Sequence, residues 1–196
     1  MEGLKLNELT DEELMEAYQS GSVEAFDVLF ARYRDRIYRY FFLKLSNSSI
    51  VHELFQETFL KLHKNRKSFE KDRKFSAWIF TIASNLFKDE LRRRSRRPAD
   101  VPNSCDSQLG LDQLSDQKNT PEASAIQKSD IQNLKLALNK IPDDQREVIL
   151  LHKYEDLSFQ EIAAMLGEKV ESVKSKAFRG YKNLRKILDP KNKEDR

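Results

Sequence analysis

The feature that most constrains this chain is residues 75–97, where an apolar segment runs directly into a dense arginine cluster. The segment reads FSAWIFTIASNLFKDELRRRSRR, and five of its last six residues are arginine. Apolar residues recur at spacings of three and four, which predicts a helix with one buried face. That face comprises Phe75, Trp78, Ile79, Ile82, Ala83, Leu86 and Phe87.

A second stripe of the same predicted helix is neutral and polar at its start and basic at its end. It comprises Thr81, Ser84 or Asn85, Lys88 and Arg92. A helix that only fills a core does not need to end in so much unpaired positive charge. Exposed aromatic rings stack on unpaired bases and arginines neutralise phosphates, so the segment is a candidate nucleic-acid surface. The alternative is an amphipathic bundle helix whose polar face is merely solvated.

Charge is distributed unevenly along the 196 residues, although the net charge is only +3. Residues 1–57 carry 11 acids and 6 bases, whereas residues 61–97 carry 4 acids and 13 bases. Residues 98–128 are acidic again, and residues 169–187 carry 7 bases and 1 acid. Two basic regions separated by an acidic one predict two contacts with a polyanion.

Local signals predict a compact four-helix domain that ends near Arg97. Thr10 and Glu13 fit a capping box, so a helix should begin near Asp11 and end at Gly21. Ser22 begins a second helix, and a third should span roughly residues 49–64. A charged loop, residues 65–74, leads into the helix described first. With only five Gly and five Pro, we expect an all-α chain.

Residues 98–119 change character and predict a flexible linker, because they are rich in polar residues and lack periodicity. Thr120-Pro121-Glu122 starts a helix that should reach about Lys140, and Pro142 breaks it. Two small helical domains are therefore expected, at residues 1–97 and 120–196.

The last third has the pattern of a helix-turn-helix. A helix over residues 143–154 precedes a short capped helix at Phe159, and Gly167 separates that helix from a longer basic one beginning at Val170. The inward residues of the last helix are Val173, Ala177, Tyr181, Leu184 and Leu188, and its outward residues are Glu171, Ser172, Lys174, Ser175, Phe178, Arg179 and Lys182. The outward set suits base edges and phosphates in a major groove. A three-helix bundle with a basic face is the alternative.

Catalytic, metal and cofactor sites are not expected. Cys105 is the only cysteine, which excludes an internal disulfide and a cysteine zinc site, and its neutral-to-acidic surroundings disfavour a reactive thiolate. The chain has no phosphate-binding loop or nucleophile elbow, and the three histidines lack ligand spacing. Asp89 and Glu90 are adjacent and so point to different helix faces. The acidic N-terminus and the lack of any apolar run of ~20 residues predict a cytoplasmic protein without membrane insertion.

Six short segments, in order along the chain, resemble the extracytoplasmic-function class of bacterial RNA polymerase sigma factors. The first is LFQETF at residues 54–59, followed by FSAWIFTIASNL at 75–86 and DELRR at 89–93. In the last third the segments are REVIL at 146–150, LSFQEIA at 157–163 and VKSK at 173–176. The resemblance covers the chain from about Asp11 to Leu188.

The resemblance implies which residues bind promoter DNA and core RNA polymerase. The −10 element would be captured by Phe69, Asn85, Lys88, Arg92 and Arg93, with a flipped base held by Phe69 and Asn85. The −35 element would be read by Glu171, Ser172, Lys174, Ser175, Phe178 and Arg179. The β′ clamp helices would contact Glu53, Gln56, Glu57 and Leu60, and the C-terminal domain would also bind the β flap. The resemblance further implies an anti-sigma partner.

Two other functions remain open from the residues alone. A helix-turn-helix regulator that is not a polymerase subunit would use the same C-terminal helices, usually as a dimer. A scaffold with two basic modules would bind DNA in a salt-sensitive way without promoter preference.

Overall fold

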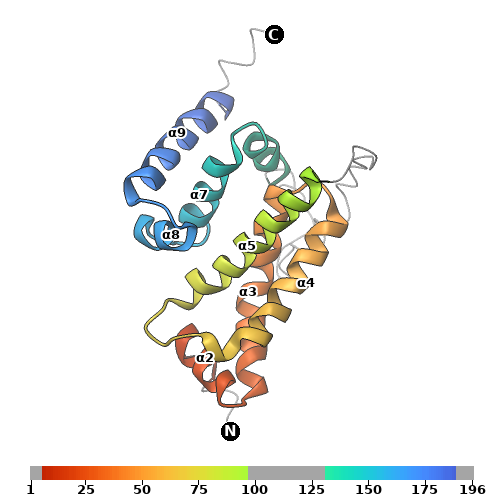
Figure 1. The fold of residues 1–196 in the computed structure, drawn as a ribbon, viewed down its shortest axis with the longest axis vertical. Helices are drawn as coiled ribbons and strands as arrows, with labels where there is room; N and C mark the ends of the chain where they lie inside the picture. Colours follow the sequence, from red (N-terminus) through yellow and green to blue (C-terminus); the bar gives the residue numbers. More distant parts are fainter. Residues whose placement is uncertain (1–5, 97–130, 189–196) are drawn as a thin grey trace, which may run out of the picture. The chain divides into compact units, whose positions relative to one another are not determined.

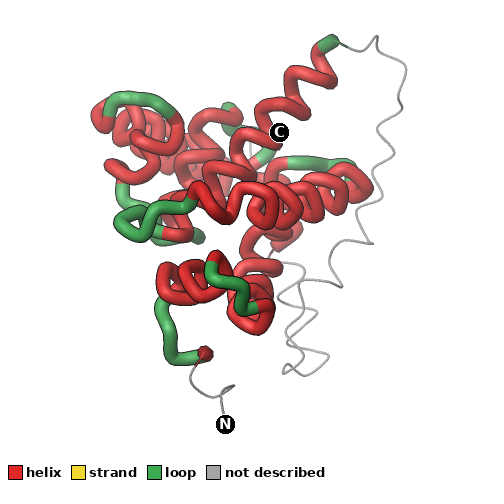
Figure 2. Tube along the Cα trace, turned by 60° about the horizontal axis from the view of Figure 1, so that its bottom comes forward, coloured by secondary structure: helices red, strands yellow, loops and turns green. Residues whose placement is uncertain are grey.

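The structure, a computed structural model, describes residues 6–96 and 131–188, and every element within those ranges is helical (Figure 2). Of these residues, those within 1–41 and 49–104 form one compact unit, and those within 42–48 and 105–196 form the other. The expected domain ends at residues 97 and 120, the linker at 98–119, Cys105 and the helix start at Thr120 lie outside the described residues.

Three long helices lie side by side in the N-terminal unit, and a short helix lies at one end of them (Figure 1). The short helix is α2 (Asp11–Gln19), and the long ones are α3 (Val23–Lys44), α4 (Ser48–Asn65) and α5 (Phe75–Ser95). A single 3-10 turn, η1 (Arg66–Ser68), follows α4 directly. The four helices predicted for this region are confirmed to within a few residues at each end.

Aromatic rings join the three long helices. Phe30 of α3 meets Phe59 of α4 edge to face, with ring centroids 4.7 Å apart. Tyr33 of α3 meets Phe75 of α5 in the same way at 5.0 Å. Edge-to-face pairs at these separations contribute ~0.5–1.5 kcal/mol each beyond the area that they bury. The contact between Tyr33 and Phe75 orients the start of α5 toward α3.

The start of α2 has the predicted capping box. The Thr10 hydroxyl accepts a hydrogen bond from the Glu13 amide, and the Glu13 carboxylate accepts one from the Thr10 amide. Gly21 follows α2 with a φ of 109°, a conformation that favours glycine, and the Ser22 hydroxyl then accepts from the Ala25 amide. The sequence signals for this boundary are therefore confirmed.

The C-terminal unit contains the predicted helix-turn-helix. Residues 131–138 are helical, and α7 (Asp143–Lys153), α8 (Phe159–Leu166) and α9 (Val170–Leu188) follow. Helix α8 begins with a second capping box, formed by Ser158 and Glu161, and ends at Gly167 with φ 70° and ψ 34°.

Helices α7 and α9 approach each other closely at Gly180. A Cβ atom at this position would lie 2.6 Å from the Ile149 Cδ1 atom and 3.2 Å from the Gln145 Cβ atom. The glycine therefore lets the two helix backbones come together, and Val173, Ala177 and Leu184 are buried on the same side of α9.

The predicted inward face of α9 is wrong at two positions. Tyr181 is 39% exposed and Leu188 is 54% exposed. Helix α9 has 19 residues, whereas α7 has 11 and α8 has 8, so its last residue, Leu188, extends beyond the packed part of the helix. Length does not explain the exposure of Tyr181, because Leu184, further along the helix, is buried.

Removal of the α8 cap should destabilise the C-terminal unit. Ser158→Ala loses the hydroxyl acceptor at the helix start, and we expect the free energy of unfolding to fall by about 1 kcal/mol. Hydrogen exchange of the α8 amides in the full chain measures this change. Ser158→Thr keeps the acceptor and should stay within a few tenths of a kcal/mol of the unchanged protein. Equal exchange in the two variants would contradict the assignment.

Candidate nucleic-acid interface

The polar stripe of α5 separates into exposed and buried positions. Asn85 and Arg92 are exposed, and Lys88, three residues after Asn85 and four before Arg92, is half-buried on the same side. Ser84, the neighbour of Asn85 in the predicted stripe, is only 1% exposed. Asn85 therefore supplies the amide that reaches solvent on this face.

The arginines at the end of α5 are organised by two acids. Glu90 is 4% exposed, and its two carboxylate oxygens lie 2.6 Å from Arg93 Nη2 and 2.8 Å from Arg94 Nε. Arg92 Nη1 lies 3.2 Å from Asp89 Oδ1. The expectation that this positive charge is unpaired is therefore wrong for these three arginines, because carboxylates three and four residues earlier lie on the same helix side.

Two opposing effects act on the Glu90 carboxyl. Burial raises its pKa, and hydrogen bonds from Arg94 and Arg93 lower it, with the net result that its pKa lies below the ordinary value. Glu90 is thus ionised at neutral pH, and two guanidinium groups share its charge.

Arg93 also joins the two predicted sites of the N-terminal unit. Its Nη1 atom lies 3.5 Å from Oε1 of Glu53, a residue of α4 expected to bind a protein partner. A pocket of about 520 Å³ opens beside it, lined by Asp89, Arg92, Arg93 and Arg96. The structure therefore brings a predicted DNA contact and a predicted polymerase contact within reach of each other.

Helix α4 presents the four expected residues away from its packed side. Glu53 and Gln56 are exposed, Glu57 is half-buried, and Leu60 is 44% exposed. The buried residues of the helix are Val51, Leu54, Thr58, Phe59 and Leu62. The four residues predicted to contact polymerase therefore lie on the side of α4 that is not packed in the N-terminal unit.

The Phe69 side chain is buried, whereas a ring that stacks on a base has to be exposed. Its side chain is 5% exposed, and its ring centroid lies 5.3 Å from that of Trp78 and 5.8 Å from that of Phe75. Asn85 lies seven residues beyond Trp78, which is about 10 Å along the helix axis. Phe69 thus belongs to an aromatic cluster at the start of α5, and Asn85 lies further along that helix.

All six predicted −35 residues are exposed on α9. Phe178 is 71% exposed, and Glu171, Ser172, Lys174, Ser175 and Arg179 are also exposed. Ser172 donates a hydrogen bond to Glu168, and the Arg179 Nε atom lies 3.4 Å from the Ser175 carbonyl. Lys176 is held on another side by Glu168 at 2.7 Å. The outward face is therefore acidic at its start and aromatic and basic further along.

The histidines take part in packing contacts. The His152 Nδ1 atom lies 2.8 Å from the Leu157 carbonyl, and its ring stacks on Phe159. His63 meets the Tyr18 hydroxyl, and the His52 ring meets that of Tyr38. Within residues 6–96 and 131–188, no group of three or more His, Cys, Asp or Glu residues is placed to hold a metal ion. The same residues include no helix of the length and apolarity that crossing a bilayer requires.

Sequence reasoning missed two residues that shape these surfaces. Glu90 could have been found, because its distance of three and four residues from Arg93 and Arg94 predicts helix ion pairs. Gln19 carried no such signal. It donates to the carbonyls of Arg66 and Phe69, which are 47 and 50 residues away in the sequence.

Two family models match separate parts of this chain. Residues 29–97 match sigma-70 region 2, and residues 131–184 match sigma-70 region 4. The first match includes α4 and α5, and the second includes the helix-turn-helix.

Curated relatives match over nearly their whole length. The chain is 32% identical to RNA polymerase sigma factor CarQ of Myxococcus xanthus over 89% of this chain and 95% of CarQ. It is 30% identical to the ECF RNA polymerase sigma factor SigW of Bacillus subtilis, over 87% of this chain and 92% of SigW.

Two solved structures are also similar to this chain over most of its length. CnrH, solved with the cytosolic domain of CnrY, superimposes with a TM-score of 0.66 at 25% identity, covering 91% of this chain and 97% of CnrH. The sigma factor RpoE of Bartonella quintana, solved with the anti-sigma factor NepR, gives 0.65 at 26% identity, covering 89% of this chain and 100% of RpoE. The chain belongs to the extracytoplasmic-function class of the sigma-70 family of RNA polymerase sigma factors.

Proposed function

We propose that this sigma factor directs core RNA polymerase to promoters by reading a −10 element with its N-terminal unit and a −35 element with its C-terminal unit. The main observation in support of the proposal is that α9 has one packed side and one exposed side. Val173, Ala177 and Gly180 pack inward, and the six candidate −35 residues all face solvent. The alternative of a regulator that is not a polymerase subunit leaves the α4 and α5 surfaces without a role.

The C-terminal unit places α9 in the major groove of the −35 element. Lysine and arginine donate to guanine and to phosphates, glutamate accepts from cytosine, and an apolar ring contacts a thymine methyl group. Lys174 and Arg179 provide the donors, Glu171 the acceptor and Phe178 the apolar ring, and all four are exposed on α9.

The N-terminal unit captures the −10 element as a single strand. Asn85 offers a donor and an acceptor to a base edge, while Lys88 and Arg92 hold the backbone. Since Phe69 is buried against Trp78, stacking of an extruded base on the Phe69 face requires this ring to leave that contact.

Promoter opening depends on polymerase, and recognition rather than catalysis is the role of this chain. Melting about ten base pairs costs on the order of 14 kcal/mol at the mean stacking energy. Trapping a base returns ~1–3 kcal/mol, so the chain alone cannot open a promoter. Glu53, Gln56, Glu57 and Leu60 bind the β′ clamp helices, and the C-terminal unit binds the β flap.

An anti-sigma factor is the proposed regulator of this chain. CnrH was solved with the cytosolic domain of CnrY, and RpoE with the anti-sigma factor NepR. A protein that covers the polymerase-binding or DNA-binding residues of this chain would prevent initiation. The proposed compartment is the cytoplasm, where polymerase acts.

Run-off transcription tests the proposed function directly. We expect purified chain and sigma-free core polymerase together to start transcription at defined sites in a promoter library. The chain without polymerase should bind promoter duplex only weakly at physiological salt, as measured by gel shift. Failure to confer start-site selection, or tight specific binding of the free chain, would contradict the proposal.

Base reading by α9 is tested by Arg179→Ala. Loss of a base-reading arginine costs ~1–3 kcal/mol, so transcription from a promoter with an intact −35 element should fall roughly 5- to 150-fold. The control is Arg185→Ala, which removes the same charge from an exposed position on the same helix. Equal losses in the two variants would mean that only overall charge matters, against the assignment.

Polymerase binding by α4 is tested by Leu60→Asp. A charge at this exposed leucine should weaken the affinity for core polymerase about tenfold or more, because the side chain can no longer be buried in the complex. Val23→Asp is the matched control, since Val23 is also apolar and is 63% exposed. Competition between variants for a limited amount of core polymerase measures the affinity. Similar affinity of both variants would place the interface elsewhere.

A further inference from the structure

One side of α2 is directed at the segment that joins α4 to α5. Glu12, Glu16 and Gln19 are spaced by four and three residues, so they lie on the same side of this short helix. Each contacts a different point of residues 66–75. This segment carries Phe69, the candidate −10 residue that precedes α5.

Gln19 makes the central contact of this set. Its Nε2 atom donates to the Arg66 carbonyl at 2.6 Å and to the Phe69 carbonyl at 2.9 Å. These two carbonyls belong to the first residue of η1 and to the residue that follows it, and the Phe69 amide also donates to the Arg66 carbonyl. A primary amide nitrogen carries two hydrogens and can satisfy both carbonyls at once.

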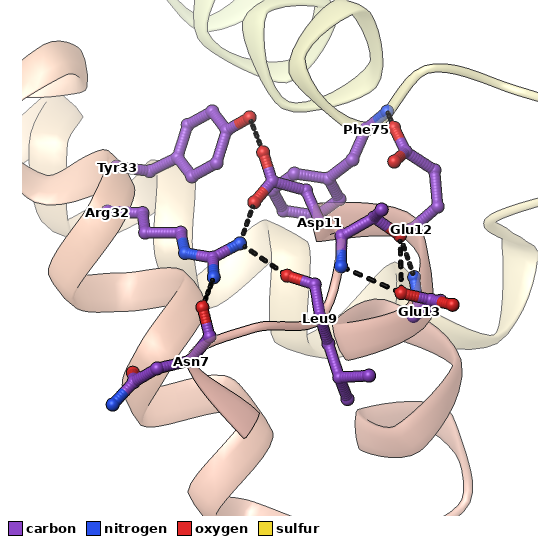
Figure 3. Close-up of polar contacts among 9 residues, drawn as sticks. Asn7, Leu9, Asp11, Glu12, Glu13, Arg32, Tyr33 and Phe75 are labelled. Carbon is purple, nitrogen blue, oxygen red and sulfur yellow. Dashed lines mark hydrogen bonds and ion pairs between the residues drawn. The ribbon is translucent and has the colours of Figure 1, made fainter. Parts of the chain in front are cut away.

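Glu12 makes the second contact, at the first residue of α5. Its Oε1 atom accepts a hydrogen bond from the Phe75 amide at 2.8 Å (Figure 3). Lys74, which precedes α5, makes no side-chain cap. A carboxylate from α2 therefore caps the positive end of α5 in place of a local residue. The third contact is the exposed ion pair between Glu16 and Lys71 at 2.7 Å.

Helix α2 is itself fastened to α3. Arg32 Nη1 lies 2.7 Å from the Asp11 carboxylate and also donates to the Leu9 carbonyl, and the Tyr33 hydroxyl donates to Asp11 (Figure 3). The Tyr33 side chain is 1% exposed, and burial raises the pKa of its hydroxyl, which therefore stays a donor. Helix α2 thus binds residues 66–75 on one side while it is itself held by hydrogen bonds and an ion pair to α3.

We propose that Gln19 and Glu12 are positioning residues for −10 recognition, which set the conformation of residues 66–75 and thereby the base preference of the chain. The inference rests on the proposed function, because it assumes that residues 66–75 take part in recognition of the −10 element. Neither residue touches DNA in this role. Their effect reaches the base through the backbone on either side of Phe69 and through the start of α5.

Trp78 provides a readout that does not depend on transcription. It is the only tryptophan of the chain, it is half-buried, and its ring contacts that of Phe69. Gln19→Ala and the isosteric Gln19→Glu both remove the two donors. Each should raise acrylamide quenching of Trp78 about twofold or more, since loss of two hydrogen bonds releases the Phe69 backbone. Ser20→Ala, at the exposed neighbouring position, should leave quenching unchanged.

The same variants are then assayed with core polymerase on two promoter libraries, one randomised in the −10 element and one in the −35 element. We expect Gln19→Ala to reduce selectivity in the −10 library about fivefold or more and to leave selectivity in the −35 library unchanged. Glu12→Ala should act in the same direction, and Glu12→Gln should restore selectivity because its amide oxygen still accepts from Phe75. If the Gln19 variants fail to fold, the comparison of Glu12→Ala with Glu12→Gln still tests the proposal.

Unchanged Trp78 quenching in the Gln19 variants would overturn the proposal. Raised quenching with unchanged −10 selectivity would also overturn it and would leave the proposed function intact. A chain with native residues that selects no −10 sequence at all would remove the proposed function and, with it, this inference.

Discussion

Burial of the aromatic face of α5 is the constraint on which the N-terminal surfaces depend. Phe75 and Phe80 are fully buried, and Tyr33 and Tyr40 of α3 meet them edge to face. Rotation of α5 by one residue would bring Asn85 toward the core, where an amide without partners costs ~1–3 kcal/mol. The inward face therefore determines which polar groups of α5 remain exposed to solvent.

Helix α9 of the C-terminal unit also has a packed side and an exposed side, and here a glycine, not an aromatic face, allows the packing. Gly180 lets α9 lie directly against α7, where any Cβ would meet Ile149. Tight packing on that side leaves the other side to solvent, including the 71%-exposed ring of Phe178. The proposed reading of the −35 element uses this exposed side of α9.

Sequence reasoning succeeded where the signal was local. Both capping boxes, at Thr10 and Ser158, join residues three apart, and both are present. The helix-turn-helix followed from Gly167 and from apolar spacing. The reasoning failed where distance along the chain separated the partners. The burial of Phe69 and the contacts of Gln19 depend on how α2 meets η1, and the exposure of Leu188 depends on how far α7 and α8 extend along α9. Sequence spacing contains none of these facts.

The buried carboxylate of Glu90 changes what the arginines at the end of α5 can contribute. Long guanidinium side chains ordinarily lose conformational freedom when they bind a polyanion, and Arg93 and Arg94 are already restrained by the acid between them. Because the Glu90 carboxylate already neutralises part of the charge of Arg93 and Arg94, less net positive charge remains at this end of the helix to displace the counterions of a polyanion. The proposed binding of DNA to this surface should consequently weaken less steeply with rising ionic strength than binding through five independent arginines would.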